Sequence, residues 1–436
     1  MEEIKQKKNK INKHSRQKKI RRNNAKLYPI YKMFSLDLLC FYSVEFLFYT
    51  ITKGLNASEV LIISACFVLF KILMQIPAVT ITDILGHKKS LVIGNILMLT
   101  YIAVIIIAPN IFFMVVACLF RALGYDIKTI VETNLLYDSV STNGGEGLYT
   151  KLDSKGAGWY YLLDGIICLV AGYLFVFNNY LPMFLCMGFV LISTILSSRF
   201  KDVHEVEKKE NVKISEVLKE YKDDLKNSIK FIVKSNRMKS YILFGAVFYG
   251  IITIIDIYRC DLLVSKGIAE EQYSMVFAIL TILAGVAVTL SRKVHKKFKN
   301  RTITFISLIY IVCCTTVGIV GNINNTITIP IIIIMYTIMK MASSMWYVIE
   351  YKYLKNFTTK EIRNKITFTY ELINGIITSI CAIIGSLLLH RFKVNQAFLL
   401  VSLVAIIGIV LTLDYMRTRF GLRPKEYKKE DIEFKL

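Results

Sequence analysis

The sequence that decides the fold lies between Ile62 and Ile107 and reads IISACFVLFKILMQIPAVTITDILGHKKSLVIGNILMLTYIAVIII. It contains two apolar blocks joined by a short charged turn, Asp83-Ile84-Leu85-Gly86-His87-Lys88-Lys89. Each block has about twenty residues, the length that a helix needs to cross the hydrocarbon core of a bilayer. The stretch therefore predicts two membrane-spanning helices, over 59–81 and 91–108, connected by a tight basic loop.

The same alternation of apolar blocks and charged turns runs through the rest of the chain. Of the 436 residues, 54% are apolar and 20% are charged, and the charges gather between the blocks. This pattern excludes a soluble multidomain enzyme, and the number of blocks excludes a protein with a single membrane anchor. We predict an all-α membrane protein with twelve transmembrane helices, at 28–52, 59–81, 91–108, 110–136, 157–177, 181–199, 240–263, 272–292, 302–321, 327–350, 366–389 and 396–416.

Basic residues dominate the loops on one side of the predicted membrane, and the net charge is +23. With the N-terminus inside, Lys and Arg fall in alternate loops, as the positive-inside rule requires. The segment His390-Arg391-Phe392-Lys393 is an exception on the outer side. We therefore expect a multi-pass protein of the plasma membrane with both termini in the cytoplasm. No basic segment is interleaved with stacking aromatic residues, so nucleic acid is not an expected partner.

The N-terminus and the cysteines each have a second interpretation. A basic segment before an apolar run can be a signal peptide, but this run is too long for one and carries Asp37 and Glu45. We expect an uncleaved first helix.

All nine cysteines fall inside apolar blocks and none forms a CxxC pair. They are expected to act as small hydrophobic residues, without a disulfide framework or a zinc site.

Charge and hydropathy divide the chain into five segments. These are a basic cytoplasmic tail (1–27), a first six-helix half (28–199), a cytoplasmic central loop (200–239), a second six-helix half (240–417) and a cytoplasmic tail (418–436). Two six-helix repeats around a central cavity are a transporter architecture. Within the central loop, Val212–Ile232 has apolar residues at helical spacing. A helix that lies on the membrane surface and a solvated linker helix both fit this pattern.

The turn after the second predicted span resembles a motif of the major facilitator superfamily. That motif is a glycine, three residues, an aspartate, a basic residue, any residue, a glycine and further basic residues. Four residues match it: Asp83, Gly86, Lys88 and Lys89. Two positions depart from it, because Val79 replaces the first glycine and Ile84 replaces the basic residue after the aspartate.

Two more segments strengthen this resemblance, which covers residues 28–417. Leu135-Leu136-Tyr137-Asp138-Ser139 resembles the end of helix 4 in a bacterial twelve-helix branch of the family, and Thr359-Lys360-Glu361-Ile362-Arg363 resembles its loop between helices 10 and 11. The resemblance implies the family fold and secondary transport by alternating access. It also implies that Asp83, Gly86, Lys88 and Lys89 form a conformational gate that latches the two halves on the inner side.

The fourth predicted span carries more charges within the membrane than any other span. Arg121, Lys128 and Glu132 share one helical face with Tyr125, and Asp126 lies beside them. Charges inside a span cost several kcal/mol unless they are paired or hydrated, so this face cannot contact lipid. Two interpretations remain open, a path for substrate or protons and a structural ladder of ion pairs. The branch that the chain resembles usually has small residues here, so the charges of Asp126, Lys128 and Glu132 depart from its pattern.

Charged residues in the other spans are further candidates for the substrate or proton path. In the first half these are the acids of span 1 and span 5: Asp37, Glu45 and Asp164. They could neutralise Arg121 and Lys128 on span 4. For Asp37, which lies near the inner end of its span, simple hydration is the alternative. In the second half Lys340 is deep enough to face a cavity. Asp256 and Arg259 fit either a gate salt bridge or interfacial solvation. Three aromatic residues are expected as interfacial anchors rather than ligand contacts: Trp346, Tyr347 and Tyr351.

The motifs that are absent exclude other activities. The chain has no GxxxxGK[ST] phosphate loop, so direct use of ATP is not expected. It has no histidine within a span and no HExxH or GxSxG motif, so we expect neither an enzyme nor a cofactor. The leading interpretation is a monomeric transporter in the lipid bilayer that couples export of a small amphipathic molecule to an ion, with a proton expected. The alternatives are proton-coupled uptake of an anionic or zwitterionic solute by Arg121, Lys128 and Lys340, and a non-transporting membrane sensor on the same fold.

Overall fold

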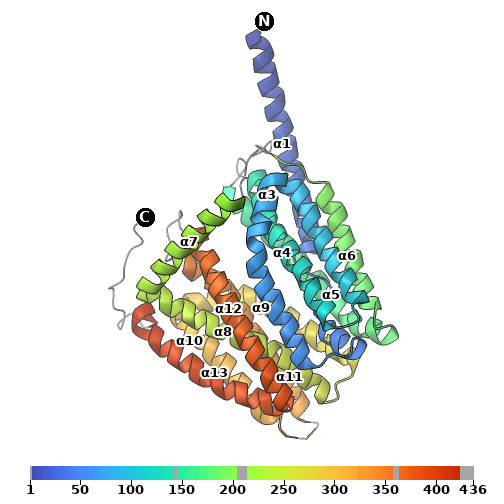
Figure 1. Ribbon diagram of the computed structural model, residues 1–436, viewed down its shortest axis with the longest axis vertical. Helices are drawn as coiled ribbons and strands as arrows, with labels where there is room; N and C mark the ends of the chain where they lie inside the picture. The colour runs from blue at the N-terminus through green and yellow to red at the C-terminus, as the bar shows by residue number, and fades with distance from the viewer. Residues whose placement is uncertain are drawn as a thin grey trace. The chain divides into compact units, whose positions relative to one another are not determined.

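The protein is described here by a computed structural model, which covers residues 2–140, 145–203, 214–323, 325, 327–356 and 363–422. These residues are mostly helical, with no strand among them. In chain order the elements are α1 (Glu2–Ser35), α2 (Glu45–Leu47), η1 (Phe48–Thr52), α3 (Ala57–Ile107), α4 (Ile111–Val140), α5 (Gly145–Phe177), α6 (Leu181–Ser198), α7 (Ile214–Lys234), α8 (Asn236–Ser265), α9 (Glu270–Phe298), α10 (Arg301–Val320), α11 (Thr328–Asn356), α12 (Arg363–Arg391), α13 (Val394–Met416) and η2 (Arg417–Gly421) (Figure 1).

Nine helices within the described residues are long and apolar enough to cross a membrane. One of them is α3, whose 51 residues would extend about 75 Å, more than twice the thickness of a hydrocarbon core. Its helical geometry breaks at Gly86, with φ 77° and ψ 172°, so α3 contains the second and third expected spans. A positive φ of this size favours glycine, which explains why Gly86 stands at the turn.

The two remaining expected spans differ from simple apolar helices. The fourth span is α4, whose apolar character is interrupted by Arg121, Asp126, Lys128 and Glu132. The first span was expected to be one helix over 28–52, and this expectation is wrong. Helix α1 begins at Glu2 and ends at Ser35, and a non-helical segment separates it from α2. In that segment the Asp37 carboxylate accepts a hydrogen bond from the Leu38 amide at 2.9 Å, a local contact that competes with helix formation.

Contacts between Cα atoms divide the chain into two compact units. Unit 1 comprises residues 1–42, 73–167 and 177–217, and unit 2 comprises 43–72, 168–176 and 218–436. In unit 1 helix α1 packs against α4 and α6, and in unit 2 α8 packs against α12 and α13. The core of unit 1 includes Tyr31, which meets the ring of Phe200 edge-on at 5.3 Å. The six-plus-six repeat expected from the sequence stays a prediction.

Helix α7 occupies the part of the central loop for which the sequence predicts an amphipathic helix. In its last turns Phe231 and Ile232 are buried, whereas Lys226 and Lys230 are exposed. Phe231 and Ile232 therefore pack against protein, whereas the apolar side chains of Ile229 and Val233 in the same turns are exposed. The motif resemblance at 359–362 lies outside the described residues.

Candidate functional site

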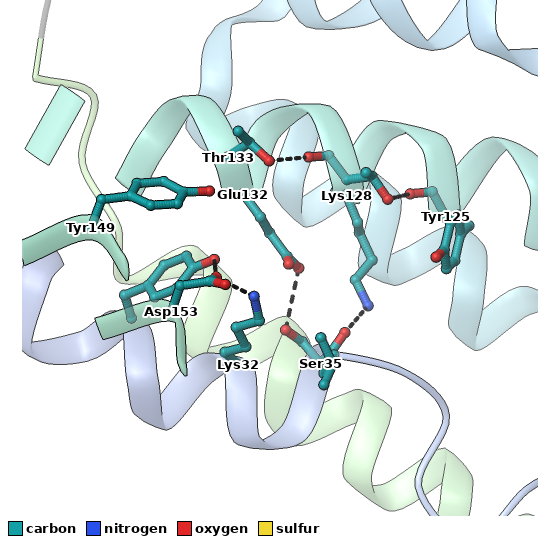
Figure 2. A pocket seen from close by; sticks show the side chains of 11 residues that line it. Lys32, Ser35, Tyr125, Lys128, Glu132, Thr133, Tyr149 and Asp153 are labelled. Atoms are coloured by element: carbon teal, nitrogen blue, oxygen red, sulfur yellow. Dashed lines mark hydrogen bonds and ion pairs between the residues drawn. The ribbon is translucent and has the colours of Figure 1, made fainter. Parts of the chain in front are cut away.

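The candidate site is a polar pocket in unit 1, formed by the end of α1, the middle of α4 and the start of α5. Its volume is about 230 Å³. Figure 2 shows lysine and carboxylate side chains from all three helices pointing into the same space. The lining residues are Tyr28, Lys32, Ser35, Leu36, Tyr125, Lys128, Thr129, Glu132, Thr133, Tyr149 and Asp153.

One side of the pocket is an ion pair between Lys32 of α1 and Asp153 of α5. The side chain of Lys32 is only 10% exposed, and the Tyr28 hydroxyl also donates to the Asp153 carboxylate, at 3.1 Å. This pair depends on a close approach of the two helices at Gly156. A Cβ atom added at Gly156 would lie 2.8 Å from the Cβ of Lys32, which is closer than packed carbon atoms approach.

The other side of the pocket is built from Lys128 and Glu132, one helical turn apart on α4. The Glu132 carboxylate accepts hydrogen bonds from the hydroxyls of Tyr31 at 2.9 Å and Ser35 at 3.2 Å. The Lys128 Nζ donates to the backbone carbonyl of Ser35 at 2.6 Å. Both charged groups therefore contact the last turn of α1, as Figure 2 shows.

A buried chain of hydrogen bonds holds the Glu132 side of the pocket in place. The Ser193 hydroxyl donates to the side-chain oxygen of Asn95 at 3.0 Å, and the Asn95 amide donates to the Tyr31 hydroxyl at 3.0 Å. Tyr31 in turn donates to Glu132. Each donor points toward the carboxylate, so the chain fixes the position of the Glu132 side chain.

Arg121 lies in a different environment on the same helix. Its guanidinium donates to the hydroxyls of Tyr42 at 2.6 Å and Tyr101 at 3.2 Å and lies over the ring of Phe41. The Tyr42 hydroxyl donates to Asp37 at 3.0 Å. Arg121 and Asp37 are therefore connected through Tyr42, and the rings of Tyr42 and Tyr101 also lie against the guanidinium as cation–π partners.

The structure gathers some of the predicted site residues and leaves others elsewhere. Lys128 and Glu132 line the pocket, and Lys128 is electrostatically coupled to both Glu132 and Asp37. The Asp164 carboxylate on α5 accepts a hydrogen bond from the backbone of Cys40, near Asp37. Asp126 is buried on α4. Glu45 and Lys340 belong to unit 2, on α2 and α11.

Unit 2 contains a buried carboxylate that the sequence analysis did not single out. Glu350 on α11 is 0% exposed and accepts hydrogen bonds from the hydroxyls of Tyr249, at 2.7 Å, and Tyr370. The Asn374 amide approaches it at 3.4 Å. All these donors, from described residues, are neutral. Glu350 ends a predicted span, where an acid is ordinarily hydrated, so the sequence offered little reason to choose it.

Two expectations for unit 2 are resolved by burial. Trp346 was expected as an interfacial anchor, and this is wrong, because it is 0% exposed and packs against Phe244 and Phe248. Arg259 forms an ion pair with Asp256 at 2.9 Å and is itself buried. Burial therefore excludes interfacial solvation for Arg259, whereas a gate role for the pair, whose two residues lie on the same helix, stays a prediction.

The turn at Gly86 is tied to other parts of unit 1 through two aspartates. The backbone amide of Lys88 donates to Asp202 at 2.9 Å, and His87 Nε2 lies 3.6 Å from an Asp138 carboxylate oxygen. The contact with Asp138 raises the pKa of His87 above its ordinary value of 6.5, against the lowering effect of burial. Asp138 belongs to the helix 4 motif, so the two matched motifs meet here. Asp83 and Lys89 are exposed.

A chain of membrane-spanning helices that holds lysines and carboxylates around a polar pocket has the features of a membrane transporter. The sequence profile of the Major Facilitator Superfamily matches residues 33–345. The protein belongs to this superfamily, and it is therefore a multi-pass transporter and not an enzyme. No curated protein sequence matches the chain.

Solved structures of transporters have the same fold. The nucleoside transporter NupG is 11% identical with a TM-score of 0.69, covering 92% of this chain and 99% of that chain. A D-xylose-proton symporter is 13% identical with a TM-score of 0.64, covering 93% and 98%. A POT family transporter in complex with 5-aminolevulinic acid is 12% identical with a TM-score of 0.61, covering 93% and 95%. At these identities the likeness establishes the fold alone.

Proposed function

We propose that the protein is a proton-coupled secondary transporter of a small anionic or zwitterionic solute, acting by alternating access in the plasma membrane as a monomer. The observation that carries this proposal is the unit 1 pocket, in which two lysines and two carboxylates surround one space of about 230 Å³. A volume of this size suits a small metabolite.

The charges of the pocket explain the choice of solute. Lys32 and Asp153 already neutralise each other, and Lys128 and Glu132 are both held by the end of α1. An acidic group of a solute can replace a carboxylate at either lysine, and an amino group can replace a lysine at either carboxylate. The exchange keeps every buried charge paired, which avoids the several kcal/mol cost of an unpaired charge.

Export of an amphipathic compound is the second candidate function. It is supported by the resemblance of Leu135–Ser139 to the end of helix 4 in a bacterial branch of the family. The polar lining of the pocket favours the charged solute instead, because the apolar part of an amphipathic molecule would leave lysines and carboxylates without hydration or partners.

We further propose that Glu350 carries the coupling proton. Its hydrogen bonds come from neutral hydroxyl and amide groups of described residues, so a proton on the carboxyl does not break an ion pair there. Such a carboxyl changes its charge without leaving a buried cation unpaired. The Glu132 carboxylate differs, because Lys128 lies one turn away.

The proposal is tested by transport into proteoliposomes with an imposed pH gradient. A panel of small anions, zwitterions and amphipathic cations would be screened first by thermal shift of the purified protein. We expect the gradient to drive accumulation of an anionic or zwitterionic solute, and Glu350→Gln to abolish accumulation while exchange of solute across the membrane continues. The control is Asp223→Asn on the exposed surface of α7. Accumulation that is independent of the gradient would contradict proton coupling, and transport only of amphipathic compounds would favour the second candidate.

A further inference from the structure

The part of α1 that directly precedes the first expected span is anchored to the rest of unit 1 through Asn24. Asn24 is only 2% exposed, and its side-chain amide donates to the Ser139 hydroxyl at 3.2 Å and to the Lys201 carbonyl at 2.8 Å. These contacts join α1 to the end of α4 and to the segment after α6. The basic residues on this part of α1 are therefore held at a fixed place on the protein.

A second pocket lies between this part of α1 and the start of α5, with a volume of about 380 Å³. It shares no lining residue with the candidate transport site. Five of its described lining residues are cations and none is acidic. Its lining residues are Lys18, Arg21, Arg22, Ala25, Lys26, Pro29, Ser139, Leu148, Leu152 and Lys155.

The arrangement of these cations indicates an anionic ligand. Four of them stand at positions i, i+3, i+4 and i+8 of α1, which places them on one broad face of that helix, and Lys155 faces them from α5. Like charges gathered around one cavity repel one another, so the cluster gains most when an anion binds between them. Arginine and lysine together are typical ligands of phosphate groups.

The surroundings of the pocket distinguish a lipid from a soluble anion. Its walls include the apolar side chains of Pro29, Leu148 and Leu152, which can contact glycerol and the first carbons of acyl chains. Lys155 also lies over the ring of Trp159 at 4.7 Å, and Trp159 is 37% exposed. A partly exposed tryptophan at a span end is typical of the headgroup region of a bilayer.

We propose that this basic pocket binds the phosphate headgroup of an anionic membrane phospholipid. The phosphate lies between the α1 cations and Lys155, and the lipid glycerol and chains contact the apolar wall. Basic pockets between helices at the cytoplasmic side of a membrane bind anionic headgroups in this way. The bound lipid fixes α1, the helix that also carries Lys32 of the transport pocket.

Native mass spectrometry of the purified protein with added phosphatidylglycerol or phosphatidylcholine tests the proposal. We expect the protein to retain phosphatidylglycerol preferentially and to gain thermal stability from it. The double variant Arg21→Gln/Arg22→Gln should bind phosphatidylglycerol about tenfold more weakly, since each basic group contributes several-fold. The matched control is Arg16→Gln/Lys19→Gln, which removes the same charge from α1 at positions that do not line the pocket.

Three results would overturn the proposal. Equal loss of binding in the two double variants would show a diffuse charge effect without a site. Equal retention of phosphatidylcholine would show that the headgroup charge is not recognised. Equal stabilisation by millimolar inorganic phosphate would identify a soluble anion as the ligand. Lys155→Gln supplies a second variant on a different helix, and it should weaken phosphatidylglycerol binding even if the double variant folds poorly.

Discussion

The side-chain nitrogen of Lys128 donates a hydrogen bond to the backbone carbonyl oxygen of Ser35, 2.6 Å away, at the residue where α1 ends. A cation at this position satisfies a carbonyl that the helix itself leaves unpaired, and it interacts favourably with the negative end of the helix dipole. Lys128 therefore stabilises the break in the first membrane span. It also lines the candidate transport pocket.

Neutralising Lys128 alone should harm the protein more than neutralising it together with its acidic neighbour. Lys128→Gln leaves the half-buried Glu132 carboxylate without the nearby cation and the Ser35 carbonyl without its charged donor, and it should cost about 1–3 kcal/mol of stability. The double variant Lys128→Gln/Glu132→Gln removes both charges and should recover part of that loss. Thermal unfolding of the purified variants measures this, with Lys89→Gln on the exposed turn as the control. Additive losses in the double variant would show that the two charges are not coupled.

The ion pair between Lys32 and Asp153 should depend on the absence of a side chain at Gly156. Gly156→Ala places a Cβ atom 2.8 Å from the Lys32 Cβ, so α1 and α5 must separate. We expect a loss of about 1–3 kcal/mol, typical of overpacking. Gly158→Ala, two residues along α5, meets no atom within 4 Å and should be neutral or stabilising, because alanine favours the helix. The same effect from both variants would contradict the close approach.

Stability should fall as the pH rises through the pKa of His87. Its contact with Asp138 raises this pKa in the folded state, and Asp202 and Asp83 act in the same direction. The stability that the His87–Asp138 contact contributes is therefore complete below about 6.5, the pKa of histidine in the unfolded chain. It is lost as the pH rises through the higher pKa that His87 has in the folded protein. Comparing Asp138→Asn with the unmodified protein at about pH 6 and about pH 8.5 measures it. The variant should be destabilised mainly at the lower pH, and a constant difference would exclude His87 as its origin.

Removing the charge of Asp83 should shift the protein toward its inward-open state. In the family this turn latches the two halves on the inner side, and a carboxylate there can accept hydrogen bonds from a helix N-terminus. We expect Asp83→Asn to change the equilibrium by about 1–3 kcal/mol without unfolding the protein. Spectroscopic distances between labels across the inner mouth measure the shift. Unchanged distances with intact transport would leave Asp83 only a local capping role at the turn.

The central loop should be inaccessible from outside the cell. A cysteine introduced at Lys219, which is exposed on α7, should not react with a membrane-impermeant thiol reagent in whole cells. The matched position is Asn178, an exposed residue in a short loop predicted to lie outside, where an introduced cysteine should react. Labelling of the unmodified protein, which has nine native cysteines, gives the background signal to subtract. Efficient labelling at residue 219 would reverse the predicted topology.

Part of the candidate site follows from the sequence because a helix converts spacing into geometry. Lys128 and Glu132 stand four residues apart in an apolar segment, so they must share one face of a helix, and that face must avoid lipid. The same reasoning could not find Lys32 and Asp153, which lie 121 positions apart near span ends. A charge at a span end is compatible with hydration, and only the partner brought beside it by folding shows that it is buried.

The sequence by itself determined the membrane class, the positions of most of the spans and the family, because these depend on the length and hydropathy of local segments and on a short motif. The tertiary structure decided where the first span breaks and which charged residues share a pocket. It also decided that Glu350 and Trp346 are buried. These features depend on contacts between helices that are distant in the chain, and the free energy of a buried charge depends on those neighbours rather than on its place in the sequence.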